Sequence, residues 1–108
     1  MGKKYLDESW DFRGANTKIY THCFHSYPAR MIPQVAGRLI DLYCKNKKLL
    51  FDPYCGTGTS LVEANLRNIN AIGTDLNPLA RLITKAKTTP ISLQVLDLYL
   101  KDFNEYIK

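Results

Sequence analysis

The chain has 108 residues, of which 45% are hydrophobic and 23% charged, which predicts one small globular domain and excludes wholesale disorder. It contains neither an apolar run near the roughly 18–20 residues of a membrane span nor a secretory signal, so we expect a soluble cytoplasmic protein with no membrane partner. The formal net charge of +5 favours a polyanionic partner, although a solvated basic surface gives the same balance.

The three cysteines are an odd number without a C-x-x-C pair, which argues against a disulfide framework and for a reducing compartment. His22, Cys23 and His25 form a weak metal pattern. A structural zinc site needs four ligands, and no second cluster supplies them, so no metal is expected.

Residues 1–31 show no sustained period but mix aromatic with basic side chains, which predicts an arm that packs on another surface. The stretch 32–45 is predicted to be a helix, with Pro33 at a first helical position and an apolar face. The short apolar run 49–51 predicts a strand buried on both faces. A second helix is expected over about 60–67, where Ser60 and Glu63 have the spacing of a capping box.

A second short strand is predicted over 70–74, and Asn77 with Pro78 supplies the start of a helix that continues to about residue 87. Residues 92–107 predict an amphipathic helix with one narrow apolar stripe, formed by Leu93, Leu96, Leu100, Phe103 and Ile107. The alternation of strands and helices indicates an α/β fold with a parallel sheet. An ordinary sheet has roughly five or six strands, so the sheet is expected to be incomplete.

A glycine loop follows the first strand directly and opens a helix, as in sites that hold nucleotide-like ligands. Gly56 and Gly58 allow a sharp turn and a close approach of backbone to ligand. Asp75 ends the next strand about twenty residues later, where a carboxylate can accept hydrogen bonds from ribose hydroxyls. A G-x-G pattern alone is weak, but its context between a strand and a spaced acid is more specific.

The residues around the glycines favour one class of ligand over two others. Leu61 occupies the position of the third glycine of dinucleotide-binding loops, and the chain contains no Gly-Lys-Ser/Thr phosphate motif. Asp52, directly before the loop, would repel a pyrophosphate but suits a cationic ligand, such as the amino-acid end of S-adenosylmethionine.

Three segments in the same order resemble amino-directed (cytosine-N4 or adenine-N6) site-specific DNA methyltransferases. The segment 51–64 resembles their cofactor loop, 73–80 resembles the motif whose acid holds the ribose, and 25–33 resembles the segment that precedes the loop. Residues 87–91 also resemble the family's continuation, so that the similarity covers roughly 20–91. It implies a partial Rossmann-like S-adenosylmethionine-dependent methyltransferase fold.

The resemblance also implies roles for individual residues. Asp52 would contact the methionine amino group, Asp75 the ribose and Leu76 the adenine. Cys55 is expected to fill space in the loop rather than to act as a nucleophile, because no base lies beside it in sequence. The predicted cofactor-binding residues are Tyr27, Pro28, Ala29, Arg30, Asp52, Pro53, Tyr54, Cys55, Gly56, Gly58, Thr59, Asp75 and Leu76.

One departure from the family is as informative as the resemblance. The family holds the target amine with a Pro-Pro-aromatic loop, and no Pro-Pro pair occurs in the chain, so no catalytic residue is predicted. We expect an N-terminal arm over 1–31, a cofactor-binding α/β core over 32–91 and a terminal helix over 92–108, all within one structural domain. DNA would be bound through a complete enzyme, with the missing parts supplied by a complementary polypeptide or a second copy of the chain. A tRNA guanine methyltransferase and a non-catalytic interaction module remain the alternatives.

Overall fold

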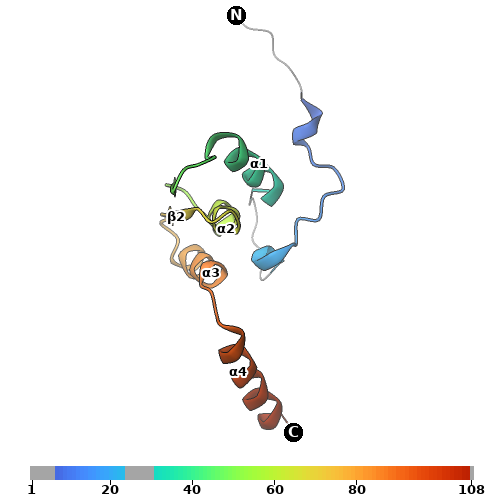
Figure 1. Cartoon of the computed structure of the whole chain (residues 1–108), viewed down its shortest axis with the longest axis vertical. Helices are drawn as coiled ribbons and strands as arrows, with labels where there is room; N and C mark the ends of the chain where they lie inside the picture. The colour runs from blue at the N-terminus through green and yellow to red at the C-terminus, as the bar shows by residue number, and fades with distance from the viewer. Residues whose placement is uncertain (1–6, 24–30, 108) are drawn as a thin grey trace, which may run out of the picture.

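The computed structural model of the chain describes residues 7–23 and 31–107. Within these ranges the predicted order of helices and strands is confirmed, and the fold is α/β (Figure 1). The elements are the 3-10 helices η1 (Glu8–Trp10) and η2 (Tyr20–Cys23), the α-helices α1 (Pro33–Tyr43), α2 (Thr59–Leu66), α3 (Pro78–Thr88) and α4 (Leu93–Tyr106), and the strands β1 (Leu49–Asp52) and β2 (Asn70–Gly73).

The two strands form a parallel pair connected by α2, and one face of this pair carries the core. Leu50 lies opposite Ala71 in the register, and both side chains pack against a buried cluster contributed by α1, α2 and the turn before β2. The buried cluster consists of Ile40, Ala64 and Ile69. Helices α1, α2 and α3 lie on the same side of the strands (Figure 1), so the described elements cover one face of the sheet.

The other face of the sheet is open, and the prediction of strands buried on both faces is wrong for this chain. Leu49 and Phe51 of β1 are 56% and 60% exposed, and Ile72 of β2 is 51% exposed. These side chains alternate with half-buried ones because successive residues of a strand point to opposite faces. No helix in the described part of the chain covers them.

The start of α2 also differs from the prediction, because Ser60 and Glu63 do not form a capping box. The helix begins after Gly58, whose φ of 85° is left-handed, and no side chain caps it. The Ser60 hydroxyl donates instead to the Asp52 carboxylate, and Glu63 binds Arg67 and lies 2.9 Å from His22 Nε2. The backbone of the glycine loop, rather than a side-chain cap, therefore determines where this helix starts.

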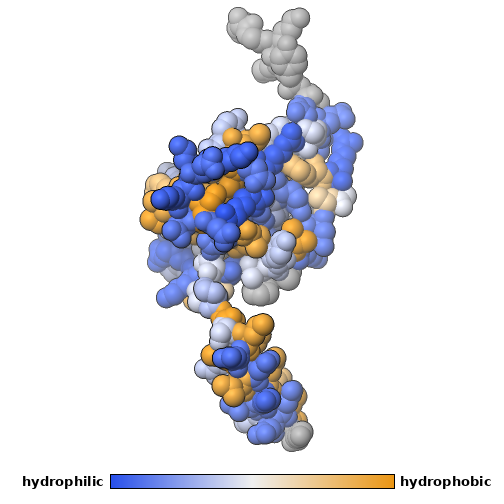
Figure 2. Space-filling model, viewed as in Figure 1, coloured by the Kyte–Doolittle hydropathy of each residue, from blue (hydrophilic) through white to orange (hydrophobic). Residues whose placement is uncertain are grey.

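The other helix starts agree with the sequence. Asn77 accepts a hydrogen bond from the Leu79 N–H at the start of α3, and Ser92 accepts one from the Val95 N–H at the start of α4. Every residue of α4 is exposed, and the helix projects away from the body of the molecule (Figure 1), with apolar and polar side chains mixed on its visible surface (Figure 2). No helix in 7–23 or 31–107 has the length and apolar character needed to cross a bilayer.

The described part of the N-terminal arm packs against α1. The guanidinium of Arg38 lies 4.0 Å from the centre of the Trp10 ring, close enough for a cation–π contact. The Gln34 amide donates to the Asn16 carbonyl oxygen at 2.7 Å. These contacts agree with the expectation that an arm rich in aromatic and basic residues would pack on a surface.

Candidate functional site

The carboxyl ends of β1 and β2 are held together by backbone hydrogen bonds that extend beyond the strands. The Thr74 N–H donates to the Asp52 carbonyl at 3.0 Å, and the Cys55 N–H donates to the Thr74 carbonyl at 2.9 Å. The Thr74 hydroxyl also donates to the Pro53 carbonyl at 2.6 Å. Asp52 and Asp75 therefore lie at neighbouring strand ends, the position at which open α/β sheets bind ligands.

Both carboxylates are oriented by hydrogen bonds from the chain. One oxygen of Asp52 accepts the Tyr54 N–H at 3.0 Å, and the other accepts the Ser60 hydroxyl. Asp75 accepts the Gly56 N–H at 3.0 Å through one oxygen and the Asn77 N–H at 2.8 Å through the other. Asp75 thus binds the glycine loop directly, although it lies 19 residues after Gly56 in the sequence. The two acids therefore flank the loop.

The two glycines of the loop differ in what a side chain at their position would meet. Gly56 has a φ of 52°, and a Cβ added there would meet no atom within 4 Å. Gly58 has a φ of 85°, and its Cβ would lie 2.7 Å from Cγ2 of Thr84. Gly58 is therefore required by packing against α3, whereas Gly56 leaves one side of the loop open for a ligand to approach the backbone.

The packing of α2 on β2 differs from that of a dinucleotide-binding loop. Leu61 takes the place of the third glycine, and its side chain is buried. The glycine at this contact is Gly73 on the strand instead, where an added Cβ would lie 2.9 Å from Cδ2 of Leu61 and 2.7 Å from Cβ of Cys55. The close contact between helix and strand is thus achieved by a glycine whose role the sequence did not indicate.

The remaining predicted site residues fall into three groups. Cys55 and Thr59 are buried, and burial raises the pKa of the Cys55 thiol, which favours the space-filling role. Pro53, Tyr54 and Leu76 are exposed beside the loop. The predicted residues Tyr27, Pro28, Ala29 and Arg30 lie outside the described part of the chain.

A cavity of about 400 Å³ lies beside Asp52, between α1 and β1. Met31, Asp52, Pro53 and Ser60 line it together with side chains of α1 and of β1, most of them apolar. The volume lies within the range of small-molecule sites. One of the two acids therefore borders a concave surface.

Comparison with known proteins now adds to this geometry. A family model described as DNA methylase matches residues 1–86. The chain belongs to this DNA methylase family. It is 45% identical to Type II methyltransferase M.MvaI of Kocuria varians over 113 aligned residues, which cover 100% of the chain and 25% of that relative. It is 31% identical to Type II methyltransferase M.MjaII of Methanocaldococcus jannaschii over 83 residues, which cover 77% of the chain and 16% of the relative.

The chain thus spans about a quarter or less of the length of these two methyltransferases. A tRNA (guanine(10)-N2)-dimethyltransferase of Methanothermobacter thermautotrophicus is 36% identical over 52 residues, which cover 47% of the chain. No solved structure matches the chain. The similarity to the two Type II methyltransferases therefore extends over more of the chain than the similarity to the tRNA enzyme.

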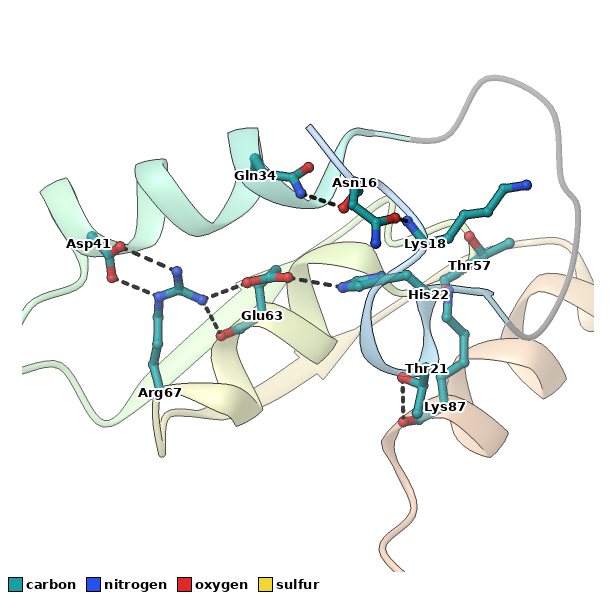
Figure 3. Close-up of polar contacts among 10 residues, drawn as sticks. All are labelled: Asn16, Lys18, Thr21, His22, Gln34, Asp41, Thr57, Glu63, Arg67 and Lys87. Carbon is teal, nitrogen blue, oxygen red and sulfur yellow. Dashed lines mark hydrogen bonds and ion pairs between the residues drawn. The ribbon is translucent and has the colours of Figure 1, made fainter. Parts of the chain in front are cut away.

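In this member of the DNA methylase family, several buried polar residues near the loop were not indicated by sequence reasoning. His22 is 1% exposed and pairs with Glu63, which also pairs with Arg67 at 2.6 Å (Figure 3). Arg67 also forms an ion pair with Asp41, whose side chain is exposed. This network connects η2 to α2. The sequence feature that could have indicated it is Glu63, a charged residue among the buried positions of a helix.

Part of the positive charge in the described part of the chain lies away from the loop. Lys45, Lys47 and Lys48 lie between α1 and β1, at the amino end of the first strand. The glycine loop lies at the carboxyl end. These three lysines, which contribute to the net charge that favours an anionic partner, are therefore remote from the candidate site.

Proposed function

We propose that the chain is the cofactor-binding segment of a DNA methyltransferase that transfers a methyl group from S-adenosylmethionine to an exocyclic amine of cytosine or adenine. The observation that carries the proposal is the pair Asp52 and Asp75 at neighbouring strand ends on either side of the glycine loop. Membership of the DNA methylase family supports the reaction class. In this proposal β1 and β2 belong to the sheet of a Rossmann-like methyltransferase fold, and the helices α1 to α3 flank it.

The residues of the loop fit this cofactor by charge and by shape. Asp52 borders the cavity and would pair with the methionine ammonium group, and Asp75 would accept hydrogen bonds from the ribose hydroxyls. The open side of Gly56 would admit the ligand to the backbone, and the exposed Leu76 would lie against the adenine. Asp52, directly before the loop, disfavours a pyrophosphate, which dinucleotides carry.

The chain would bind and orient the cofactor, which when bound supplies a methyl group on a positively charged sulfur. The remaining cofactor contacts in the proposal are the backbone bed of the loop and the segment Tyr27 to Arg30. The sequence has no Pro-Pro-aromatic loop to hold a target amine. Methylation of a base within duplex DNA also requires a pocket for the flipped base. We therefore assign the target amine and DNA recognition to other parts of a complete enzyme.

Two uncovered surfaces support a complementary polypeptide as the partner. The open face of the sheet presents Leu49, Phe51 and Ile72. The helix α4 presents a further apolar stripe that touches no described element closely. Because the related Type II methyltransferases are four or more times longer, the remaining part of such an enzyme is the occupant we propose for both surfaces.

A tRNA guanine methyltransferase is the second candidate, since its relatives match part of the chain. That match covers 47% of the chain, whereas M.MvaI matches all of it. We therefore favour DNA. Methyl transfer by the assembled enzyme to duplex DNA and to tRNA, measured side by side, separates the two.

Isothermal titration of the chain with S-adenosylhomocysteine, the product form of the cofactor, tests the proposal. Asp52→Asn and Asp75→Asn each keep an oxygen for the loop N–H but remove the charge. Each is expected to weaken binding by about 1–3 kcal/mol, the effect of a lost charged hydrogen bond. Asp102→Asn on α4 is the matched control and should bind as the wild type does. Unchanged affinity in both loop variants contradicts the proposal, and no binding at all favours a non-catalytic module.

A further inference from the structure

Two side chains of α3 hold two successive carbonyl groups of the glycine loop. The Thr84 hydroxyl donates to the Gly56 carbonyl at 3.0 Å. The Lys87 ammonium donates to the Thr57 carbonyl at 2.8 Å. Residues 84 and 87 are three apart and so lie on the same face of the helix, which faces the loop.

These contacts are buried, although they involve a hydroxyl and a charge. Thr84 and Lys87 are 7% and 6% exposed, and Thr57 is 3% exposed. Burying an ammonium group is costly unless it is hydrogen-bonded, and the Lys87 contact to the loop contributes to offsetting that cost. Lys85, in the same turn of α3, is exposed.

The glycine loop and α3 are in close contact at Gly58. The absence of a side chain at Gly58 allows Thr84 to approach, since a Cβ at Gly58 would lie 2.7 Å from one Thr84 atom and 2.9 Å from its hydroxyl oxygen. The Thr21 hydroxyl in turn donates to the Lys87 carbonyl at 3.2 Å (Figure 3). The end of α3 therefore lies between the loop and η2, where its two donors cannot move independently of the packing.

We propose that Thr84 and Lys87 are positioning residues that fix the peptide planes of the glycine loop for its ligand. In a trans peptide the C=O and N–H point in opposite directions. The Gly56 carbonyl points to α3, and hence the Thr57 N–H of the same peptide points away from it. No acceptor in the described part of the chain takes a hydrogen bond from this N–H. The loop thus presents a backbone donor on the side opposite α3.

This inference rests on the proposed function for the identity of the ligand, S-adenosylmethionine, but not for the shape of the loop. It also explains why α3 carries a lysine at a buried position. A purely structural role for the two side chains would change stability alone. A positioning role changes the geometry of the loop and the affinity for the ligand while the rest of the fold is retained.

The experiment compares four variants of the chain. Thr84→Val keeps the shape but removes the donor, and Thr84→Ser restores a hydroxyl. Lys87→Met removes the buried ammonium, and Lys85→Met is its exposed control on the same helix. Each is titrated with S-adenosylhomocysteine, and the amide ¹H–¹⁵N resonances of Thr57 and Gly58 are recorded without ligand.

Thr84→Val and Lys87→Met are expected to weaken binding by about tenfold and to shift the two loop resonances, with most other amides unchanged. Thr84→Ser and Lys85→Met should resemble the wild type. Loop resonances that do not move in Thr84→Val overturn the inference, as does equal binding by the valine and serine variants. If the wild type binds no S-adenosylhomocysteine, the proposed ligand is wrong, and the resonances still decide whether α3 positions the loop. If Lys87→Met does not fold, the Thr84 pair decides.

Discussion

Three glycine-to-alanine substitutions in this chain distinguish the effects of backbone strain and packing on stability from the effect of ligand access on affinity. Gly14, Gly56 and Gly58 all have positive φ angles, of 74°, 52° and 85°. An alanine in such a conformation costs about 1–2 kcal/mol in each case. A Cβ would meet nothing within 4 Å at Gly14 or Gly56, but would lie 2.7 Å from Thr84 at Gly58.

The magnitudes follow from these contacts. Gly14→Ala and Gly56→Ala should each destabilise the fold by about 1–2 kcal/mol. Gly58→Ala adds the displacement of a packed side chain, about 1–3 kcal/mol more. At about 4–8 °C per kcal/mol for a small domain, Gly58→Ala should melt well below the other two. Circular dichroism at a fixed protein concentration measures all three.

Ligand binding gives the second comparison. Gly56→Ala should lose affinity for S-adenosylhomocysteine by about tenfold or more, because its Cβ lies on the open side of the loop, whereas Gly14→Ala should bind normally. Equal melting of Gly58→Ala and Gly14→Ala would refute the packing contact with Thr84. Wild-type affinity in Gly56→Ala would show that no ligand approaches the loop from that side.

Three further predictions concern activity, assembly and reactivity. The chain alone should transfer no methyl group to duplex DNA in a radiolabelled assay, because it lacks a loop for the target amine; turnover by the purified chain contradicts this. Analytical ultracentrifugation at micromolar concentration should find association, because the five stripe residues, four in α4 and Ile107 directly after it, are worth roughly 1.5–3 kcal/mol each when buried. Leu100→Glu should reduce that association and Leu98→Glu, off the stripe, should not, whereas a wild-type chain that sediments as a monomer refutes the reasoning. Burial raises the pKa of the Cys55 thiol, so Cys55 should be alkylated more slowly at pH 7.5 than the less buried Cys44, as measured by peptide mapping. The rate of alkylation at Cys55 should increase when the pH is raised above the ordinary range of thiol pKa values.

The order of the elements was predictable from the sequence because each carries a local signal. Asn77 with Pro78 marks the start of α3, and Ser92 marks the start of α4, because the side-chain oxygen of each accepts a backbone N–H nearby in sequence. The glycine loop and Asp75 were predictable from their spacing. The presence of only two strands in the described part of the chain was also predictable, because each strand is a short apolar run before a loop.

The tertiary structure alone decided the partners of the polar residues. Ser60 and Glu63 have the spacing of a capping box, but Ser60 bonds to Asp52 across the loop, and Glu63 lies 2.9 Å from Nε2 of His22, which is 41 residues away in the sequence. Spacing reports which partners are possible within a few residues. It does not report which long-range partner satisfies a buried group better.

The same limit explains why Thr84 and Lys87 were not predicted as part of the site. In the sequence they are ordinary polar residues of an amphipathic helix, 28 and 30 residues from the carbonyls that they bind. Only the packing of α3 against Gly58 brings them to the loop. The sequence by itself therefore determined the elements, the loop and its two acids, because these depend on local chain geometry and residue spacing. The tertiary structure decided what supports the loop, because a buried polar group must find its partner wherever the fold places one.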